Sequence, residues 1–324
     1  MNHLIIVTGA AGFIGRNVVA ELNRRGHDNL LLVDKLGTNE QWTNLVGLRF
    51  EDIISPDDFL KNVKAGVAPK AVACIHLGAC SATTEKDADY LLDNNYRYTR
   101  TLCEWCLSHG VRFVYASSAA TYGDGSLGYS DADAVTPTLR PLNMYGYSKH
   151  LFDLWALKSG LFTQIVGLKY FNVYGPYEDH KGEMRSLVKK AYHQIHKAGY
   201  IELFKSYLPD YQDGEQKRDF IFVRDAVNVT LHFALESGTG GLLNCGTGVA
   251  RTWIDLAKAL FVAIGSEPDI RFIEMPAILQ GKYQYFTQAD PTKLQQSGYM
   301  EPFMSLEEGV RDYVQTHLAG TSAS

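Results

Sequence analysis

Short apolar runs alternate with longer amphipathic runs through the first half of the chain, and this rhythm restricts the folds open to it. The apolar runs are LIIVTG, LLLVD, AVACIHLGA and RFVYASS, and helical periodicity lies between them at residues 13–25, 57–63 and 87–109. Strands that are apolar on both faces are typical of a parallel sheet with helices on each side. The sequence therefore predicts an α/β fold with a doubly wound parallel sheet.

A glycine-rich turn joins the first expected strand to the first expected helix. In VTGAAGFIG, the residues Gly9, Gly12 and Gly15 stand at this junction, with Phe13 and Ile14 inside it. Glycines let a backbone turn sharply and approach a pyrophosphate, which the unpaired N–H groups of a helix N-terminus can bind. A plain tight turn is the alternative for the spacing by itself. In this context we predict a Rossmann-type dinucleotide site that includes all five residues.

An acidic residue follows the second expected strand. Asp34 comes 19 residues after Gly15, about where an acid binds the ribose hydroxyls of NAD. A helix or turn cap is its alternative role. Lys35 and Arg16 are cations that could meet a 2′-phosphate, so these residues leave NAD and NADP open.

Composition limits the partners. A formal charge of −5 argues against a nucleic-acid groove, which concentrates Lys and Arg. No apolar run approaches the roughly 20 residues of a membrane span, and no basic and apolar leader is visible. The five scattered cysteines suggest reduced thiols in a cytosol. We expect a cytoplasmic protein that binds a small ligand.

A tyrosine and a lysine in MYGYSK form the candidate reactive pair. Tyr145 and Lys149 are four residues apart on an expected helix and therefore share one face. A free tyrosine has a pKa of about 10, and a nearby ammonium and a cationic nicotinamide would lower it. Ser118 ends the strand RFVYASS, at the sheet edge where ligands bind in open α/β folds. The pattern predicts proton transfer by Tyr145, and a surface pair is the alternative.

The pattern of elements changes after Pro176. A charged helical stretch covers residues 183–197, and sheet-like and helical segments follow a polar loop. We predict a domain that binds NAD(P), formed by residues 1–172 plus about 219–246. A smaller α/β substrate lobe would contain about 173–218 plus 247–324. We expect TQIVGLKYFNVYG, before the change, to form one strand.

Four motifs, TGAAGFIG, ASSAATYG, YGYSK and YFNVYGP, together resemble the extended short-chain dehydrogenase/reductase enzymes that modify nucleotide sugars. The match covers nearly the whole chain. Within that family, GACSATTE, DNNYRYTRTL, NVYGPYEDHKG and KRDFIFVRD are similar to the branch that epimerises carbon 6 of ADP-linked heptoses, precursors of lipopolysaccharide cores. The resemblance implies an isomerase that oxidises and then reduces this carbon. It also implies one tightly bound NADP, or NAD, per subunit and a homo-oligomer.

The resemblance also implies roles for single residues. Tyr145, Lys149 and Ser118 would be catalytic, and Lys181 would be a second acid/base, although an exposed lysine is the usual finding at such a turn. Further cofactor contacts would come from Gly78, Ala79, Cys80, Ser81, Asn94, Val173 and Lys181. Substrate contacts would come from Ser118, Asn172, Glu183, Lys190, Phe204, Arg218 and Tyr283. The alternatives are an ion pair of Arg218 with Asp219 or Asp225 and a core position for Tyr283.

Four single positions depart from the pattern of this branch, and near Phe204 the expected FEGS reads FKSY and is followed by extra residues. Leu77 replaces an expected glutamate, Gln41 a lysine near the adenosine phosphate, Glu183 a serine and Lys190 a histidine. A related nucleotide-linked sugar therefore stays open as substrate, and a UDP-hexose 4-epimerase is the first alternative. A sensor that binds NAD(P) without turnover is the alternative from another class of protein.

Overall fold

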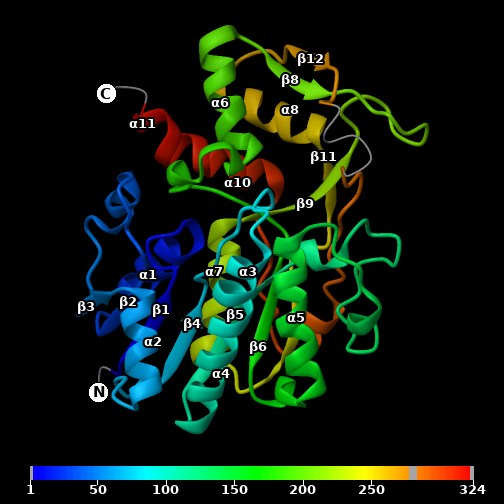
Figure 1. Ribbon diagram of the computed structural model, residues 1–324. Coiled ribbons are helices and arrows are strands. Elements are labelled where there is room, and N and C mark those ends of the chain that lie inside the picture. Colours follow the sequence, from blue (N-terminus) through cyan, green and yellow to red (C-terminus); the bar gives the residue numbers. More distant parts are fainter. Residues whose placement is uncertain (1–2, 277–282, 322–324) are drawn as a thin grey trace.

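A seven-stranded parallel sheet forms the centre of the molecule (Figure 1). The computed structural model describes residues 3–276 and 283–321. Its sheet order is β10-β6-β5-β4-β1-β2-β3, which confirms the predicted α/β class. The strands are β1 (Ile5–Thr8), β2 (Leu30–Val33), β3 (Asp52–Ile54), β4 (Ala73–His76), β5 (Arg112–Ser118), β6 (Val166–Tyr170) and β10 (Gly241–Cys245). The strand order reverses between β1 and β4, where open α/β sheets bind ligands.

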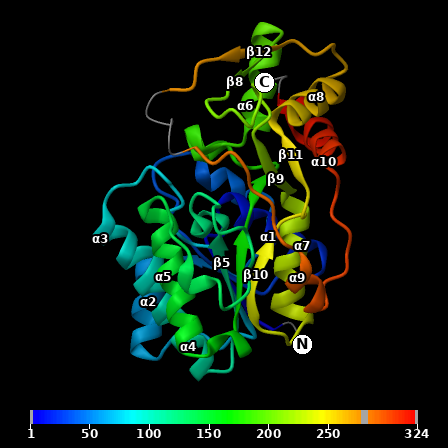
Figure 2. The same cartoon turned by 90° about the vertical axis from the view of Figure 1, so that its right-hand side faces the viewer.

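Helices cover both faces of this sheet, as the apolar strands require. Successive side chains of a strand point to opposite faces. Ile5 and Val7 of β1 therefore pack in the core shared with α1 (Phe13–Arg24) and α7 (Val223–Leu231). Ile6 packs in the core shared with α2 (Pro56–Ala65), α4 (Tyr98–Ser108) and α5 (Met144–Lys158). Figure 2 shows these two groups of helices on opposite sides of the sheet.

A second group of elements lies beyond the carboxyl ends of the strands, at the top of Figure 1. One small sheet contains β7 (Asn172–Tyr174), β9 (Lys217–Phe222) and β11 (Ala250–Thr252), and β8 (Ile201–Phe204) pairs with β12 (Ile270–Ile273). The helices here are α6 (Leu187–Ala198), α8 (Trp253–Ile264) and α10 (Leu306–Tyr313). This group covers the edge of the main sheet where its strands end.

Two sequence-based boundaries are wrong. The segment expected as one strand is divided at Phe171, because β6 belongs to the main sheet and β7 pairs with β9. The helix expected from residue 183 begins at Leu187, because the Ser186 side chain accepts a hydrogen bond from the Lys189 amide and caps it there.

The remaining short elements connect the larger ones. The expected helix at 87–109 is continuous but contains a π-helical segment, η2, between α3 and α4. The short elements are η1 (Glu40–Leu45), α3 (Ala88–Leu91), η2 (Leu92–Arg97), η3 (Ala119–Tyr122), η4 (Thr136–Thr138), η5 (Leu161–Thr163), η6 (Asp179–Met184), η7 (His232–Glu236), α9 (Thr292–Gln296), η8 (Val314–Leu318) and α11 (Ala319–Thr321).

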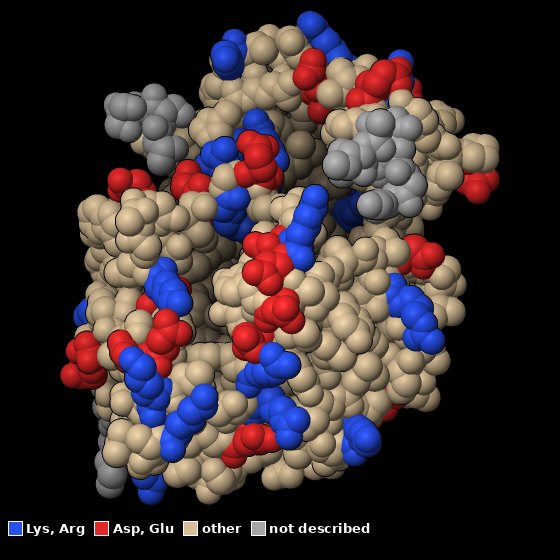
Figure 3. Space-filling view, in the orientation of Figure 1, with Lys and Arg blue, Asp and Glu red and all other residues tan. Residues whose placement is uncertain are grey.

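Acidic and basic side chains are mixed on the face of the molecule shown in Figure 3. This face carries no broad basic field of the kind that nucleic-acid binding requires, in keeping with the formal charge of −5. Within residues 3–276 and 283–321, no helix is long and apolar enough to cross a membrane.

Candidate active site

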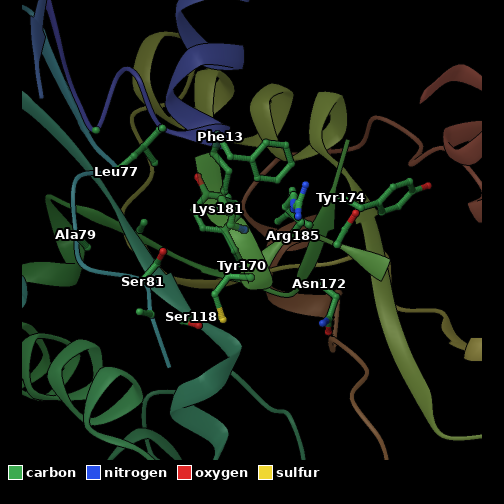
Figure 4. Close-up of a pocket in the computed structure, with 18 of the residues that line it drawn as sticks. Phe13, Leu77, Ala79, Ser81, Ser118, Tyr170, Asn172, Tyr174, Lys181 and Arg185 are labelled. Carbon is green, nitrogen blue, oxygen red and sulfur yellow. The ribbon is translucent and has the colours of Figure 1, made fainter. Parts of the chain in front are cut away.

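A cavity of about 680 Å³ opens at the carboxyl ends of β1, β4, β5 and β6 (Figure 4). Its size is in the range of small-molecule sites. Most of the predicted site residues lie in its lining: Gly9, Gly12, Phe13, Ile14, Gly15, Asp34, Gly78, Ala79, Cys80, Ser81, Ser118, Tyr145, Lys149, Asn172, Val173 and Lys181. The fold thus brings together residues from seven separate segments of the sequence.

The glycine turn fits a pyrophosphate. Gly9 has a φ of +68°, and a Cβ at this position would lie 2.6 Å from the amide nitrogen of Gly78. A Cβ on Gly15 would collide with the carbonyl oxygen of Gly9. Gly12 begins α1 without a side-chain cap, so the first-turn N–H groups are left for an anion. The backbone at this turn can approach a phosphate closely, as the fingerprint predicts.

Asp34 combines its two predicted roles. Its carboxylate accepts hydrogen bonds from the Ala11 amide at 2.7 Å and the Lys35 amide at 2.8 Å, and it also lines the cavity. Burial raises the pKa of Asp34, and these backbone N–H groups oppose the rise. The carboxylate fixes the glycine turn while it faces the expected position of a ribose.

The two cations predicted near that ribose lie outside the cavity lining. The Lys35 ammonium is 3.0 Å from the carboxylate of Asp57, and both side chains are about two-thirds exposed. The Arg16 guanidinium lies 3.5 Å from the ring centroid of Tyr177. Of the two, Lys35 takes part in an exposed ion pair, which is a weak interaction.

A buried asparagine that the sequence analysis missed holds the loop at residues 78–81. The Asn95 side chain accepts from the Cys80 amide and donates to the Cys80 carbonyl, both at 2.9 Å, and donates to Ser148 Oγ at 3.0 Å. The predicted Asn94 lies outside the cavity lining and donates to Asn95 Oδ1 at 3.0 Å. Asn95 could have been found from its position four residues after the apolar Leu91. This spacing places both residues on the same, buried face of the helix.

The candidate reactive groups converge from two elements. Ser118 ends β5, and Tyr145 and Lys149 stand one turn apart on α5. The side chain of Asn143 begins this helix by accepting from the Gly146 amide at 2.8 Å. Tyr145 shares a hydrogen bond with Ser118. The Lys149 side chain is 4% exposed and has no hydrogen-bond partner among the described residues, so its ammonium is left for a ligand in the cavity.

Burial dominates the ionisation of both groups on α5. It raises the pKa of Tyr145, and the hydrogen bond to Ser118 opposes this rise. Burial lowers the pKa of Lys149 to about 8, against the attraction of Asp153 and Cys80. The protein groups by themselves therefore do not lower the pKa of Tyr145, in contrast to what the sequence analysis expected. The phenol stays protonated at neutral pH unless a further positive charge lies beside it.

The segment η6 covers the cavity near α1. The Lys181 ammonium lies 5.1 Å from the ring centroid of Phe13, and burial lowers its pKa against the attraction of Glu178. The neighbouring His180 hydrogen bonds to the side chain of Asn44 at 3.1 Å. Lys181 thus belongs to the cavity lining, and the alternative of an ordinary exposed lysine does not describe it. Arg185, which the sequence analysis did not select, lines the cavity as well (Figure 4).

Two of the substituted positions pair with each other outside the lining. The Lys190 ammonium is 3.3 Å from the carboxylate of Glu183 and also donates to the Glu183 carbonyl. The Glu183 side chain is 94% exposed. Neither residue reaches the cavity in this arrangement, and their predicted substrate contacts remain predictions.

Three other predicted substrate residues form a cluster behind the cavity wall. The Arg218 guanidinium lies 5.1 Å from the ring centroid of Tyr283, whose ring is 6.4 Å from that of Phe204. The hydroxyl of Tyr283 accepts a hydrogen bond from the indole of Trp253 at 2.9 Å, and Trp253 lines the cavity.

Arg218 donates to backbone carbonyls, those of Lys217 at 2.8 Å and of Gln284. Asp219 instead accepts from the amides of Thr247 and Gly248. The ion pair considered as the alternative for Arg218 is therefore not formed with Asp219.

Asp225 is also engaged elsewhere. Its carboxylate accepts a hydrogen bond from the Met304 amide at 2.9 Å. Arg218 thus has carbonyl partners in place of either acid considered for it.

Comparison with known proteins identifies the family. Residues 5–246 match the model of the NAD dependent epimerase/dehydratase family. The chain is 54% identical over 317 residues to the ADP-L-glycero-D-manno-heptose-6-epimerase of Nitratidesulfovibrio vulgaris strain DP4, with 98% of each chain covered.

Two solved structures share the fold across their full length. The ADP-L-glycero-D-manno-heptose-6-epimerase of Helicobacter pylori superposes with a TM-score of 0.80 at 27% identity, covering 100% of this chain and 97% of that one. The UDP-glucose 4-epimerase of Thermotoga maritima, solved with UDP-glucose, also gives 0.80, at 26% identity and with 98% and 99% covered. The matched residues include the glycine turn, Ser118, Tyr145 and Lys149, and the chain belongs to the NAD dependent epimerase/dehydratase family.

Proposed function

We propose that this protein is an isomerase that converts ADP-D-glycero-D-manno-heptose into ADP-L-glycero-D-manno-heptose by transient oxidation at carbon 6. The observation that carries the proposal is the 54% identity, over 98% of both chains, to a relative with this activity in its name. The cavity supports it, because Ser118, Tyr145 and Lys149 all face the space where a sugar and a cofactor would meet. The product would serve as a precursor of lipopolysaccharide cores.

Each reactive residue has a role that its position suits. Ser118 donates a hydrogen bond to the oxygen on carbon 6 and holds it beside Tyr145. Tyr145 takes the hydroxyl proton of one epimer as the carbonyl forms, and returns a proton when the hydroxyl of that epimer forms again. A bound NAD(P) supplies the hydride acceptor and, in its oxidised form, a positive charge. Together with the Lys149 ammonium, this charge opposes the effect of burial on the Tyr145 pKa.

Lys181 is proposed as the second acid/base. The two epimers present their hydroxyls in different directions, so one proton-transfer group cannot serve both equally. Lys181 lies in the cavity lining on η6, and Ser118 and Tyr145 line the same cavity from β5 and α5. Burial lowers its pKa, which makes the neutral amine easier to reach.

The cofactor is proposed to be NADP, one per subunit and tightly held, with NAD as the alternative. Lys35 supports NADP, since an exposed ion pair contributes at most about 1 kcal/mol and a 2′-phosphate can draw the ammonium away from Asp57. Asp34 supports NAD, because its carboxylate faces the cavity and suits ribose hydroxyls. Mass spectrometry of the nucleotide released from denatured protein distinguishes the two.

The wider organisation follows from the same proposal. The division into an NAD(P)-binding domain and a substrate lobe, the cytoplasmic location and the homo-oligomer are retained as predictions. The contact of the two parts around the cavity suits a substrate held between them, with the nucleotide of the sugar against α6, α8 and β9.

A proton NMR assay without added cofactor tests the activity. Purified protein is incubated with ADP-D-glycero-D-manno-heptose and, separately, with UDP-glucose. Conversion of the heptose alone supports both the substrate and a retained cofactor. Conversion of UDP-glucose alone would favour a 4-epimerase, and a bound nucleotide with no turnover of either sugar would favour a sensor or another nucleotide sugar.

A further inference from the structure

A fully buried ion pair lies behind the reactive centre and is not part of the cavity lining. Lys169 on β6 and Asp153 on α5 approach to 3.6 Å, and neither side chain has exposed surface. The ring of Tyr122 closes the site above Lys169, with its centroid 4.5 Å from the ammonium. Removing two charges from water costs several kcal/mol per ion, so such a pair does not by itself explain stability. Its position calls for another explanation.

Hydrogen bonds connect the pair by two paths to the end of β5, where Ser118 lies. Asp153 accepts from Ser117 Oγ and from the Tyr115 hydroxyl, each at 2.7 Å. Ser117 immediately precedes Ser118, so this contact fixes the strand on one side of the catalytic serine.

The second path runs through the lysine. Lys169 donates to Thr121 Oγ1 at 2.7 Å, and Thr121 Oγ1 donates to the Ser118 carbonyl at 2.8 Å. The backbone of Ser118 is therefore held from both sides by groups bonded to Asp153 or Lys169.

The carboxylate of the pair also shares a helix with the other catalytic groups. Asp153 stands one turn after Lys149 and two turns after Tyr145 on α5, so all three lie on related faces of that helix. The pair joins α5 to β5 and β6 at the level where Ser118 and Tyr145 must meet.

We propose that Asp153 and Lys169 form a positioning pair, which sets the separation of Ser118 and Tyr145 and places a carboxylate one helical turn from Lys149. The proposal deepens the proposed epimerase function and rests on it for the activity measurements. Neither residue lines the cavity. Both act through the residues that do.

Asp153 also opposes the loss of charge on Lys149. The titratable groups near Lys149 include Tyr145 and Asp153, each one turn away on α5, Cys80 in the loop after β4 and His76 on β4. Burial lowers the pKa of Lys149 to about 8, and Asp153 acts against this lowering. Without the carboxylate, the lysine would lose its proton at a lower pH.

Asp153→Asn and the double variant Asp153→Asn with Lys169→Met test the proposal. The single change leaves the Lys169 charge buried without its partner and is expected to lower the melting temperature. The double change removes both charges and is expected to recover most of that loss. Glu307→Gln, which breaks the partly exposed pair with Arg251 and leaves Asp153 and Lys169 in place, is the matched control.

Two readouts separate positioning from a merely structural role. In protein labelled with 13C at lysine Cε, the NMR titration of Lys149 is assigned by loss of its signal in Lys149→Arg. Its midpoint should fall by about 1 pH unit in both Asp153 variants, the lower end of the effect of a nearby opposite charge. In the epimerase assay, kcat should fall about 10-fold or more with little change in KM. The loss of kcat on the alkaline side of its pH profile should begin at a lower pH.

Restored stability in the double variant, with the wild-type Lys149 midpoint, would overturn the proposal, since the pair would then serve the fold alone. An unchanged kcat in folded Asp153→Asn would overturn it equally. Wild-type protein that is inactive on the heptose would refute the proposed function. The titration of Lys149 would still test the role of the Asp153–Lys169 pair, because it does not require activity.

Discussion

A buried histidine below the glycine turn should make the protein sensitive to mild acid. His76 ends β4 and is 1% exposed. Its Nδ1 lies 2.6 Å from Thr8 Oγ1 and its Nε2 lies 2.8 Å from Thr99 Oγ1. Thr8 Oγ1 also accepts from the Gly78 amide at 3.0 Å, so the ring supports two segments of the cofactor cavity. Burial lowers the pKa of His76 to about 3, and the charge of Lys149 adds to this effect.

The sign and size of the effect follow from linkage. In the unfolded chain the pKa of a histidine is about 6.5, so the unfolded state takes up a proton below that pH. The folded state does not do so until the pH approaches 3. Stability is therefore lost as the pH falls from about 6.5 toward 3, at about 1.4 kcal/mol per pH unit. Between pH 7 and pH 5 this amounts to about 2 kcal/mol from His76 alone.

Urea unfolding at pH 7, 6 and 5 measures this loss, in wild type and in His76→Gln, which carries no charge at any of these pH values. The wild type should lose about 2 kcal/mol more than the variant over this range, and bound nucleotide should be released in parallel. His3→Gln, at an exposed position, is the control and should follow the wild type. Equal losses in wild type and His76→Gln would refute the reasoning.

Three further changes test the cavity. Tyr145→Phe should keep the bound nucleotide and lower kcat by about 10²- to 10⁴-fold, whereas Tyr147→Phe, at an exposed site on the same helix, should be active in the same NMR assay. Gly9→Ala should yield protein without bound nucleotide by mass spectrometry, because its φ of +68° and the 2.6 Å approach to Gly78 leave no room for a Cβ; a variant that retains the nucleotide would contradict this account of the turn. Lys35→Met should shift the retained nucleotide from NADP toward NAD, with Lys61→Met as the exposed control, and an unchanged ratio would remove Lys35 from the recognition of the 2′-phosphate.

The sheet and the glycine turn could be predicted because their signals are local. Apolar runs mark the strands wherever they pair, and Gly9 and Gly15 are required by contacts with the backbone of residues 9–10 and 77–78. The break at Phe171 could not be predicted, since both halves of that segment have strand composition. Only the pairing of β7 with β9 separates them.

The sequence also could not predict the role of residues whose partners are distant in the chain. Asp153 and Lys169 look like ordinary helix and strand positions until the fold brings them to 3.6 Å. Arg218 carried a clear motif, but the partners of its guanidinium could not be deduced from it. They are the carbonyls of Lys217 and Gln284, the second 66 residues away in the chain.

The four departures from the family pattern divide into two kinds once their positions are known. Glu183 and Lys190 pair with each other outside the cavity lining. Gln41 and Leu77 do line the cavity, on the side of Asp34 and the glycine turn where the cofactor is expected. The substitutions that can change binding therefore bear on the cofactor more than on the sugar. With no lysine at position 41, Lys35 and Arg16 are the cations that the sequence offers to a 2′-phosphate, and Lys35 would have to leave Asp57 to reach it.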